Sequence, residues 1–258
     1  MSISRPGPKE LKTELDKLSV IIPAHNEAEN LVACITGIEK ILGKNKINRE
    51  IIVVNDNSTD NTNQVLDNLC LQFKCLKVVE NKGECGFGRT VRLGLQEFSG
   101  DAVAIMMADF SDSPKDLVVY WRSLQEGNDC AFGSRFIRGG KVSNYPFVKL
   151  IANRMVNTMI RFAFNIKCND ITNAFKMYRR EVIEGCRPLI SPHFNLTVEI
   201  PLKAIIRGYS WVVVPISWKN REKGVAKLKL REMGSRYFFI IAYLWLEKYF
   251  SRGDYHRK

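Results

Sequence analysis

The chain has 258 residues, of which 45% are hydrophobic and 26% charged, so its composition is that of an ordinary globular protein with room for one large α/β domain, alone or with an appendage. Its formal net charge of +12 indicates an anionic partner such as nucleic acid, a phosphorylated small molecule or a membrane surface, unless the charge serves only solubility. No recognisable module or basic repeat supports nucleic acid, and no apolar run reaches the 18 or more residues that span a bilayer.

The cysteines and the N-terminal segment bear on compartment and metal binding. The seven cysteines form no C-x-x-C pair and mostly lie within apolar patterns, which predicts buried thiols in a reducing compartment. Because no group of cysteines with His25, His193 or His256 has ligand spacing, we expect no zinc site. Residues 1–17 are polar and lack the apolar stretch of a signal peptide, so we interpret them as a short tail.

Predicted strands and helices alternate along the first half of the chain. Apolar residues recur at helical spacing between the strands, for example from Leu31 to Leu42, and the intervening loops are dense in turn-forming and helix-capping residues. This alternation with short connections predicts a mostly parallel sheet wound with helices. The predicted strands are residues 18–22, 50–54, 75–79 and 102–107.

The fourth predicted strand ends abruptly in two acids, Asp109 and Asp112, after which Ser113 and Pro114 begin a helix. Both carboxylates should therefore lie at the C-terminal edge of the sheet, where open α/β sheets bind ligands. The local pattern leaves a second interpretation open, in which one of these acids only caps the following helix.

Polar residues also follow the three earlier strands. His25 and Glu27 come after the first strand, Asp56 after the second, and residues 81–88 after the third. Since successive βα loops of a parallel sheet emerge on one edge, we expect these loops to converge with the two acids into one polar pocket.

The glycines of the third loop do not indicate a dinucleotide site. Gly83, Gly86 and Gly88 follow a strand and precede a helix, but their spacing is not G-x-G-x-x-G and the strand is not the first one. The chain also lacks a G-x-x-x-x-G-K-[ST] phosphate loop. A hydride-transferring dehydrogenase and a phosphate-loop kinase are therefore poor interpretations.

Together the motifs resemble family 2 glycosyltransferases with a GT-A fold, in particular dolichyl-phosphate mannose synthases and bacterial polyprenyl-phosphate sugar transferases. The resemblance covers roughly residues 18–228 and rests on five motifs in their family order, which are much more specific together than alone. Two distal segments, NDITNAFKMYRREV and NREKGVAKL, resemble stretches of that subgroup. The five motifs are IIPAHNEAENL, IIVVNDNSTDNT, ENKGECGFGRTVRLGL, MMADFSDSP and FGSRFIRGG.

The resemblance implies a nucleotide-sugar donor and roles for the residues that match the family motifs. His25 would offer a flat ring to the base where the family usually has a tyrosine, and Asp109 would face the diphosphate with Mg²⁺ or Mn²⁺, helped by Ser111. The implied donor-binding residues are Pro23, His25, Glu27, Asp56, Gly83, Ala108 and Asp109, and the implied catalytic residues are Asp109, Asp112, Arg135 and Asp170.

The sequence departs from the family pattern at several of these positions. Met107 stands where the family has the first acid of its D-x-D motif, and Asn55 replaces the first acid of the second loop. A thioether cannot replace a hard oxygen ligand, so weaker metal binding, or completion of the shell by Ser111 and water, is expected. Ala174, Lys176 and Ala226 replace the usual Gly, Arg and Ser in the half of the match that binds the acceptor.

The expected acceptor is a polyprenyl phosphate, which is already an anion and needs cations rather than a base. If the acceptor is instead a sugar hydroxyl, Asp170 would be the base. A non-catalytic relative that binds nucleotide-sugar or lipid remains a third possibility, motivated by Met107 and Asn55. The candidate acceptor-binding cations are Arg135, Lys176, Arg221 and Lys227, whose alternative interpretation is a solvated basic face.

Two apolar segments bear on membrane contact. Residues 237–246 and 149–166 are too short to span a bilayer, but each would serve as a core helix or as an interfacial helix with basic flanks. Because a lipid phosphate acceptor requires it, we expect a peripheral protein at the cytoplasmic face of the membrane. The expected domains are an N-terminal tail at 1–17, the GT-A domain at 18–228, and a C-terminal amphipathic helix with a basic tail at 229–258.

Overall fold

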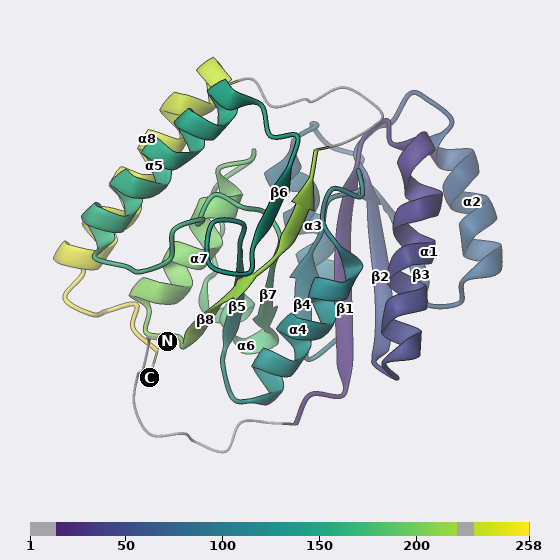
Figure 1. Cartoon of the computed structure of the whole chain (residues 1–258), viewed down its shortest axis with the longest axis horizontal. Coiled ribbons are helices and arrows are strands. Elements are labelled where there is room, and N and C mark those ends of the chain that lie inside the picture. The colour runs from purple at the N-terminus through teal and green to yellow at the C-terminus, as the bar shows by residue number, and fades with distance from the viewer. Residues whose placement is uncertain (1–13, 221–229, 258) are drawn as a thin grey trace.

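A computed structural model describes residues 14–220 and 230–257. A seven-stranded sheet with the order β3-β2-β1-β4-β7-β5-β8 forms the centre of the molecule, and helices cover both of its faces (Figure 1). The strands are β1 (Lys17–Ala24), β2 (Asn48–Asn55), β3 (Leu76–Glu80), β4 (Ala102–Ile105), β5 (Cys130–Ser134), β6 (Lys141–Ser143), β7 (Lys176–Arg179), β8 (Trp211–Pro215) and β9 (Ser217–Lys219). The helices are α1 (Ala28–Lys44), α2 (Thr62–Gln72), α3 (Phe87–Glu97), α4 (Pro114–Gln125), α5 (Phe147–Phe164), α6 (Arg180–Gly185), α7 (Leu196–Ile206) and α8 (Leu230–Phe250).

The sheet is mixed and mostly parallel, as expected. β1 pairs in parallel with both β2 and β4, and β2 pairs in parallel with β3. β7 lies antiparallel between β4 and β5, and β8 pairs in parallel with β5. The four predicted strands are all present, but the fourth ends at Ile105, so Met106 and Met107 already belong to the loop that carries the acids.

The two faces of the sheet are buried under different helices. Val20 and Ile22 of β1 pack on the face that α1, α2 and α4 cover, whereas Ile21 belongs to the core formed with α3, α6 and α7. Since successive strand side chains point to opposite faces, a central strand buried on both sides reads as a continuous apolar run. This explains why β1 lacks the alternating pattern of a half-exposed strand.

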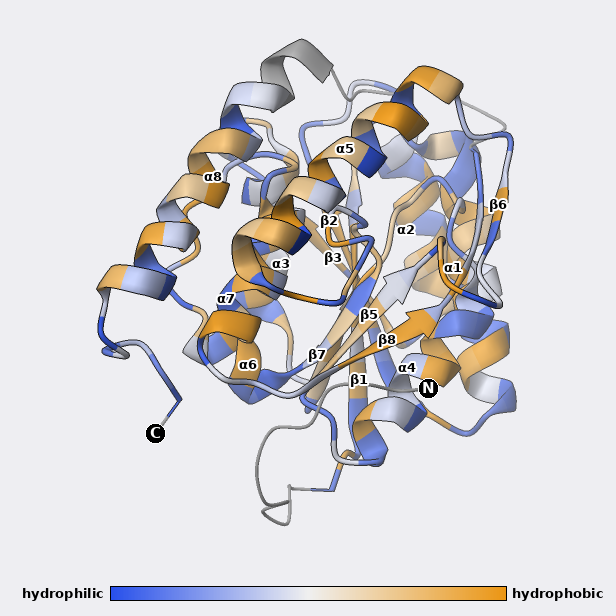
Figure 2. Ribbon diagram, turned by 60° about the vertical axis from the view of Figure 1, so that its left-hand side comes forward, coloured by the Kyte–Doolittle hydropathy of each residue, from blue (hydrophilic) through white to orange (hydrophobic). Residues whose placement is uncertain are grey.

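α5 and α8 form an outer layer beyond the second core and lie side by side (Figures 1 and 2). The ammonium of Lys248 on α8 donates to the carbonyl oxygen of Phe164 at the end of α5, at 2.6 Å. Ile160 of α5 and Ile240 of α8 are fully buried, which ties both helices to the core. Among the residues that the structure describes, no helix is both long enough and apolar enough to cross a membrane.

The cysteines follow the apolar pattern only in part. Cys34, Cys130 and Cys186 are buried, as is Cys168, in agreement with the prediction for apolar segments. Cys75 is half-buried, whereas Cys85, in the loop before α3, and Cys70, on α2, are exposed. The prediction of buried thiols is therefore wrong for these two positions.

Candidate active site

A cavity of about 1150 Å³ lies at the C-terminal edge of the parallel strands and extends beneath α5 and α8. The four βα loops predicted to converge do converge here, together with the loop after β5 and the segment before β7. Clefts at this edge are where open α/β sheets bind ligands. The predicted site residues that line the cavity are Pro23, His25, Glu27, Asp56, Asp109, Ser111, Asp112 and Arg135.

His25 and Asp56 form one end of the cavity and are held in place by their neighbours. Nδ1 of His25 donates to the backbone carbonyl of Asp56 at 2.6 Å, which fixes the plane of the ring. The Asp56 carboxylate accepts hydrogen bonds from the Asn81 side chain at 2.6 Å and from the Gly86 backbone at 2.9 Å. A flat ring beside an oriented carboxylate suits a nucleotide base, which combines an aromatic face with polar edges.

The replacement of an acid by Asn55 has a structural explanation. The Asn55 side chain is buried and donates to the Glu80 carboxylate at 3.0 Å, and its carbonyl oxygen accepts from the Ser58 backbone at 3.3 Å. An aspartate here would bury a second negative charge next to Glu80, which is unfavourable at this distance. Asn55 does not line the cavity, so this departure concerns the wall behind the site.

The glycines of the third loop allow close backbone packing. A Cβ atom on Gly88 would lie 2.3 Å from the carbonyl oxygen of Ser191, and one on Gly86 would lie 2.6 Å from that of Pro192. Only residues without a side chain fit this approach. The glycines therefore bring the start of α3 against the segment that carries His193 into the cavity wall.

Asp109 and Asp112 follow β4 and face the cavity from one short loop. Oδ1 of Asp109 accepts a hydrogen bond from the Ser111 backbone at 3.1 Å, and Asp112 pairs with Trp218 through an isolated β-bridge. The N-cap of α4 is Ser113, whose side chain makes no capping hydrogen bond. The alternative interpretation of the two acids as helix caps is therefore wrong.

Asp112 has the properties of a carboxylate that could bind a cation. It is 3% exposed, and its Oδ1 atom is buried without a hydrogen-bond partner. Burial and the neighbouring Asp109 carboxylate raise the pKa of Asp112 to about 7, although Arg135 opposes this shift. Oxygen ligands of this kind fit Mg²⁺ or Mn²⁺, and a divalent cation would satisfy the orphan oxygen and offset the like charges.

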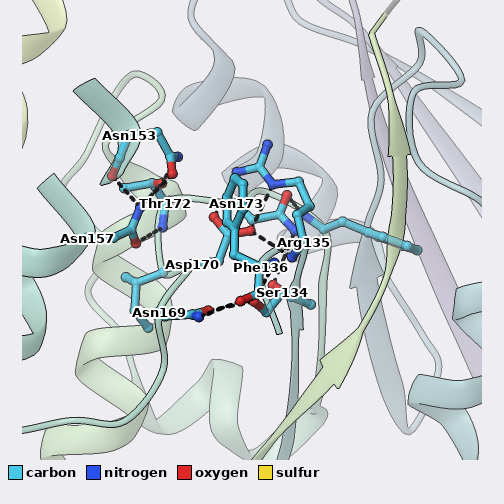
Figure 3. Close-up of polar contacts among 12 residues, drawn as sticks. Ser134, Arg135, Phe136, Asn153, Asn157, Asn169, Asp170, Thr172 and Asn173 are labelled. Carbon is cyan, nitrogen blue, oxygen red and sulfur yellow. Dashed lines mark hydrogen bonds and ion pairs between the residues drawn. The ribbon is translucent and has the colours of Figure 1, made fainter. Parts of the chain in front are cut away.

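Arg135 occupies the middle of the cavity wall and is held by Asp170 (Figure 3). Its Nε and Nη2 atoms donate to the two carboxylate oxygens of Asp170 at 2.8 and 2.7 Å. The guanidinium carbon also lies 5.4, 5.3 and 5.6 Å from the ring centres of Phe136, Tyr145 and Trp218. These contacts fix the orientation of a cation that faces the cavity.

The segment that carries Asp170 also positions α5 (Figure 3). The Thr172 hydroxyl accepts hydrogen bonds from the side chains of Asn153 and Asn157, each at 2.8 Å, and both asparagines lie on α5. One residue before Asp170, Asn169 accepts from the Ser134 hydroxyl at 2.6 Å. One short segment therefore links the loop after β5 to the helix that roofs the cavity.

Lys176 does not line the cavity, although its predicted role in acceptor binding requires this. Its side chain is fully buried, and its ammonium donates to the backbone carbonyl oxygens of Ile171, Asn173 and Thr197 behind the cavity wall. Burial lowers its pKa to about 8. Arg221 and Lys227 lie outside the described residues. The predicted site residues that do not line the cavity are Gly83, Ala108, Asp170 and Lys176.

Comparison with known proteins identifies the family. Residues 19–187 match the profile of Glycosyl transferase family 2. The chain belongs to this family. A dolichol-phosphate mannosyltransferase of Pyrococcus furiosus is 35% identical over 83% of the chain, which spans 59% of that protein. A polyprenol monophosphomannose synthase of Mycolicibacterium smegmatis is 33% identical over 81% of the chain and 80% of its own length.

Similarity to solved structures confirms the GT-A fold. A glucosyl-3-phosphoglycerate synthase from Mycobacterium tuberculosis, in complex with Mn²⁺, UDP and glucosyl-3-phosphoglycerate, superposes with a TM-score of 0.66. It is 19% identical to the chain, and the match covers 90% of the chain and 80% of that protein. At this identity the likeness concerns the fold alone.

Several residues of this family 2 chain that shape the cavity were not predicted. Tyr145 and Trp218 pack against each other, with ring centres 5.0 Å apart, and both lie beside the guanidinium of Arg135. Asn153 and Asn157 had a weak signal, since two amides four residues apart interrupt an otherwise apolar helix face. Tyr145 and Trp218 belong to segments without a recognised motif, so their position beside Arg135 could be seen only in the folded structure.

Proposed function

We propose that this chain is an inverting glycosyltransferase that moves a hexose from a nucleotide-sugar to a polyprenyl phosphate. One observation carries the proposal: a single cavity joins a polar end, with His25, Asp56 and Asp109, to an apolar end beneath α5 and α8. A substrate pair made of a charged nucleotide-sugar and a lipid phosphate matches both ends. The similarity to the two mannose synthases supports the same pairing.

The donor would lie along the loops after β1, β2 and β4. His25 and Asp56 would hold the base, and Pro23 and Glu27 would form the ribose side of the same pocket. Asp109, with Asp112 and Ser111, would hold Mg²⁺ or Mn²⁺, which would neutralise charge on the departing nucleoside diphosphate. Met107 lines this part of the cavity and supplies no hard ligand, so we expect modest metal affinity.

Arg135 is the proposed contact for the acceptor phosphate. Asp170 engages its Nε and Nη2 atoms, and the remaining N–H groups of the guanidinium would bind phosphate oxygens. An acceptor oxygen would then form a bond to the anomeric carbon while the bond from that carbon to the diphosphate oxygen breaks, which inverts the configuration. No proton has to be removed, because the acceptor phosphate is already ionised.

The environment of Asp170 favours this acceptor over a sugar hydroxyl. Both of its oxygens are bound to Arg135, and the side chain is fully buried and outside the cavity lining. A general base must reach the proton that it removes, directly or through one water molecule. We therefore propose Asp170 as a positioning residue for Arg135 and Lys176 as a support for the same segment.

The polyprenyl chain would leave the cavity beneath α5 and α8. Met155, Met159 and Phe238 line this end, and Met155 is also 68% exposed on the outside of α5. Both helices contain hydrophobic stretches, coloured orange in Figure 2, and further large apolar side chains on them are exposed. They are Phe147, Val148, Ile151, Phe162, Phe239, Leu246 and Phe250.

We propose that this outer face, formed by the exposed apolar residues of α5 and α8, lies against the cytoplasmic face of a membrane. Lys149 and Arg236 line the cavity near the same face, which would place cations at the level of the lipid headgroups. Exposed apolar surface that is continuous with a binding cavity typically marks an interaction site.

A transfer assay with purified protein tests the proposal. The chain is incubated with Mn²⁺, a short polyprenyl phosphate in detergent, and each of a panel of labelled GDP- and UDP-hexoses. We expect label to move into the organic phase with one donor and to depend on the divalent ion. Nucleotide binding without transfer from any donor would contradict the proposal and favour the non-catalytic relative that Met107 motivates.

A further inference from the structure

Three side chains with metal-binding chemistry meet at the base end of the cavity. They are His25, Asp56 and Cys85, from the loops after β1, β2 and β3, and one ligand atom of each (a ring nitrogen, a carboxylate oxygen and Sγ) lies within 4.8 Å of the other two. All three line the cavity. The sequence spacing gave no sign of this group, and the expectation of no zinc site rested on that spacing.

Hydrogen bonds prepare each of the three groups for a metal ion. A carbonyl oxygen cannot donate, so Nδ1 of His25 carries the proton towards Asp56, and the lone pair for a metal lies on Nε2. Asn81 and Gly86 fix the Asp56 carboxylate, whose oxygens retain further lone pairs. Neighbours that orient ligands in this way are typical of functional metal sites.

The position of Cys85 suits a ligand that closes on an ion. Its thiol is exposed, and Sγ accepts a hydrogen bond from the Asn57 side chain at 3.5 Å. Zinc–ligand bonds of about 2.0–2.3 Å put tetrahedral ligands roughly 3.5 Å apart. The group therefore needs only a modest inward movement, which an exposed side chain on a loop can make.

We propose that His25, Asp56 and Cys85 form a site for Zn²⁺ or another thiophilic divalent cation, which excludes the donor nucleotide. The thiol releases its proton to solvent when it binds, and the resulting thiolate and the carboxylate balance the charge of the ion. Imidazole and thiolate ligands select Zn²⁺ over Mg²⁺ or Mn²⁺, so this site is chemically distinct from the Asp109 site. A water molecule completes a four-coordinate shell.

The competition follows from the shared residues. The exclusion of the donor rests on the proposed function, because His25 and Asp56 are also the proposed contacts of the base. An ion bound to both would remove the ring face and the carboxylate that the base needs. Zinc would then inhibit the protein by raising the apparent KM for the donor, and more donor would relieve the inhibition.

Cobalt absorption tests the site independently of any transferase activity. Co²⁺ substitutes for Zn²⁺, and a cobalt–thiolate bond gives a near-ultraviolet charge-transfer band that oxygen ligands do not give. We expect this band when Co²⁺ is added to the reduced full chain, and we expect Zn²⁺ to abolish it. Cys85→Ser should remove the band, and His25→Gln should weaken cobalt binding at least about tenfold. No band in the wild type, or an unchanged band in Cys85→Ser, would overturn the site.

Cys70→Ser is the matched control, since Cys70 is the other exposed cysteine that the structure describes and lies on α2. It should leave the band unchanged. A second titration adds GDP or UDP to the cobalt-loaded protein, and the band should fall as the nucleotide binds. A band that persists at saturating nucleotide would overturn the competition. Failure to transfer any sugar, with the band and its displacement intact, would count against the proposed function alone.

Discussion

Arg135 and Asp170 are joined by two hydrogen bonds of 2.8 and 2.7 Å, although they are 35 residues apart in the chain. The Arg135 backbone also donates to the same carboxylate, at 3.1 Å. The pair therefore fixes both the loop after β5 and the cation that faces the cavity. Because the two side chains are 7% and 0% exposed, each depends on the other for its charge to be stable in the interior.

Removal of the Asp170 charge should destabilise the protein strongly. Asp170→Asn keeps the size of the side chain but leaves the guanidinium of Arg135 buried without a counter-charge, so we expect a loss of roughly 3 kcal/mol in the free energy of unfolding. Urea unfolding measures this loss. Glu97→Gln is the control, because Glu97 pairs with Lys77 at the surface and should cost less than about 1 kcal/mol. Equal losses in the two variants would contradict the structural role of the pair.

Substitution of Asp112 should separate stability from activity. Asp112→Asn removes a buried carboxyl group whose pKa is raised from 3.8 to about 7. Between these two pH values, the Asp112 side chain of the wild type is protonated in the folded state and ionised in the unfolded state. The contribution of this group to stability therefore falls as the pH rises from about 4 to 7. In the presence of a chelator, the variant should gain roughly 2–4 kcal/mol relative to wild type between pH 4 and pH 8.

Transfer activity should change in the opposite direction. Asp112→Asn should lower sugar transfer by at least about a hundredfold, as should Asp109→Ala, because the first replaces a charged carboxylate of the proposed metal site by a neutral amide and the second removes a carboxylate altogether. Urea unfolding and the transfer assay are run on the same preparations. A variant at either position that keeps wild-type activity would show that the metal assignment is wrong.

Glu50 gives a pH prediction away from the cavity. Burial opposes its ionisation, but hydrogen bonds from Ser19, Ser99 and Lys17 outweigh this effect and lower its pKa to about 2. Its stabilising effect is therefore present above about pH 4.5 and is lost as the pH falls towards 2. Because the group is partly in water, Glu50→Gln should cost only about 1 kcal/mol at pH 7, and the difference should vanish near pH 2. A difference that does not change with pH would contradict this account.

The outer face of α5 should control binding to membranes. Phe147 and Phe162 are 73% and 83% exposed, so a Phe147→Ser/Phe162→Ser variant should fold normally. It should bind at least about tenfold more weakly to vesicles of phosphatidylcholine and phosphatidylglycerol, since each ring contributes on the order of 1.5–3 kcal/mol when buried. Leu71→Ser is the control, because Leu71 is 87% exposed on α2. Equal vesicle binding by the two variants would contradict the proposed orientation.

The sequence was sufficient for the first half of the sheet because the signals there are local. A continuous apolar run such as that of β1 can only be buried on both faces, and the polar residues directly after it, such as His25, must emerge at the sheet edge. The position of the cavity followed from the same reasoning, since parallel strands place their following loops together. The order of the motifs then identified the family.

Long-range pairings were beyond the reach of local patterns. The sequence near Lys176 does not predict that its ammonium donates to three backbone carbonyl oxygens. Likewise, the sequence near Asp170 does not predict its pairing with Arg135. The loops of His25 and Cys85 were predicted to converge, but the direct approach of these two side chains depends on β1, β2 and β3 being adjacent and parallel. Such contacts depend on strand order and on how distant loops pack, which the apolar pattern of a single strand does not encode.

A comparison of two acceptors tests the central claim most directly. The chain is incubated with its preferred nucleotide-sugar and either a polyprenyl phosphate or the polyprenol with the same chain but no phosphate. We expect a glycosyl phosphate lipid, inverted at the anomeric carbon, from the first acceptor and at least about a hundredfold less product from the second, because the proposed role of Arg135 is to bind the phosphate group that the alcohol lacks. Equal transfer to the alcohol, or retention of configuration, would contradict the account.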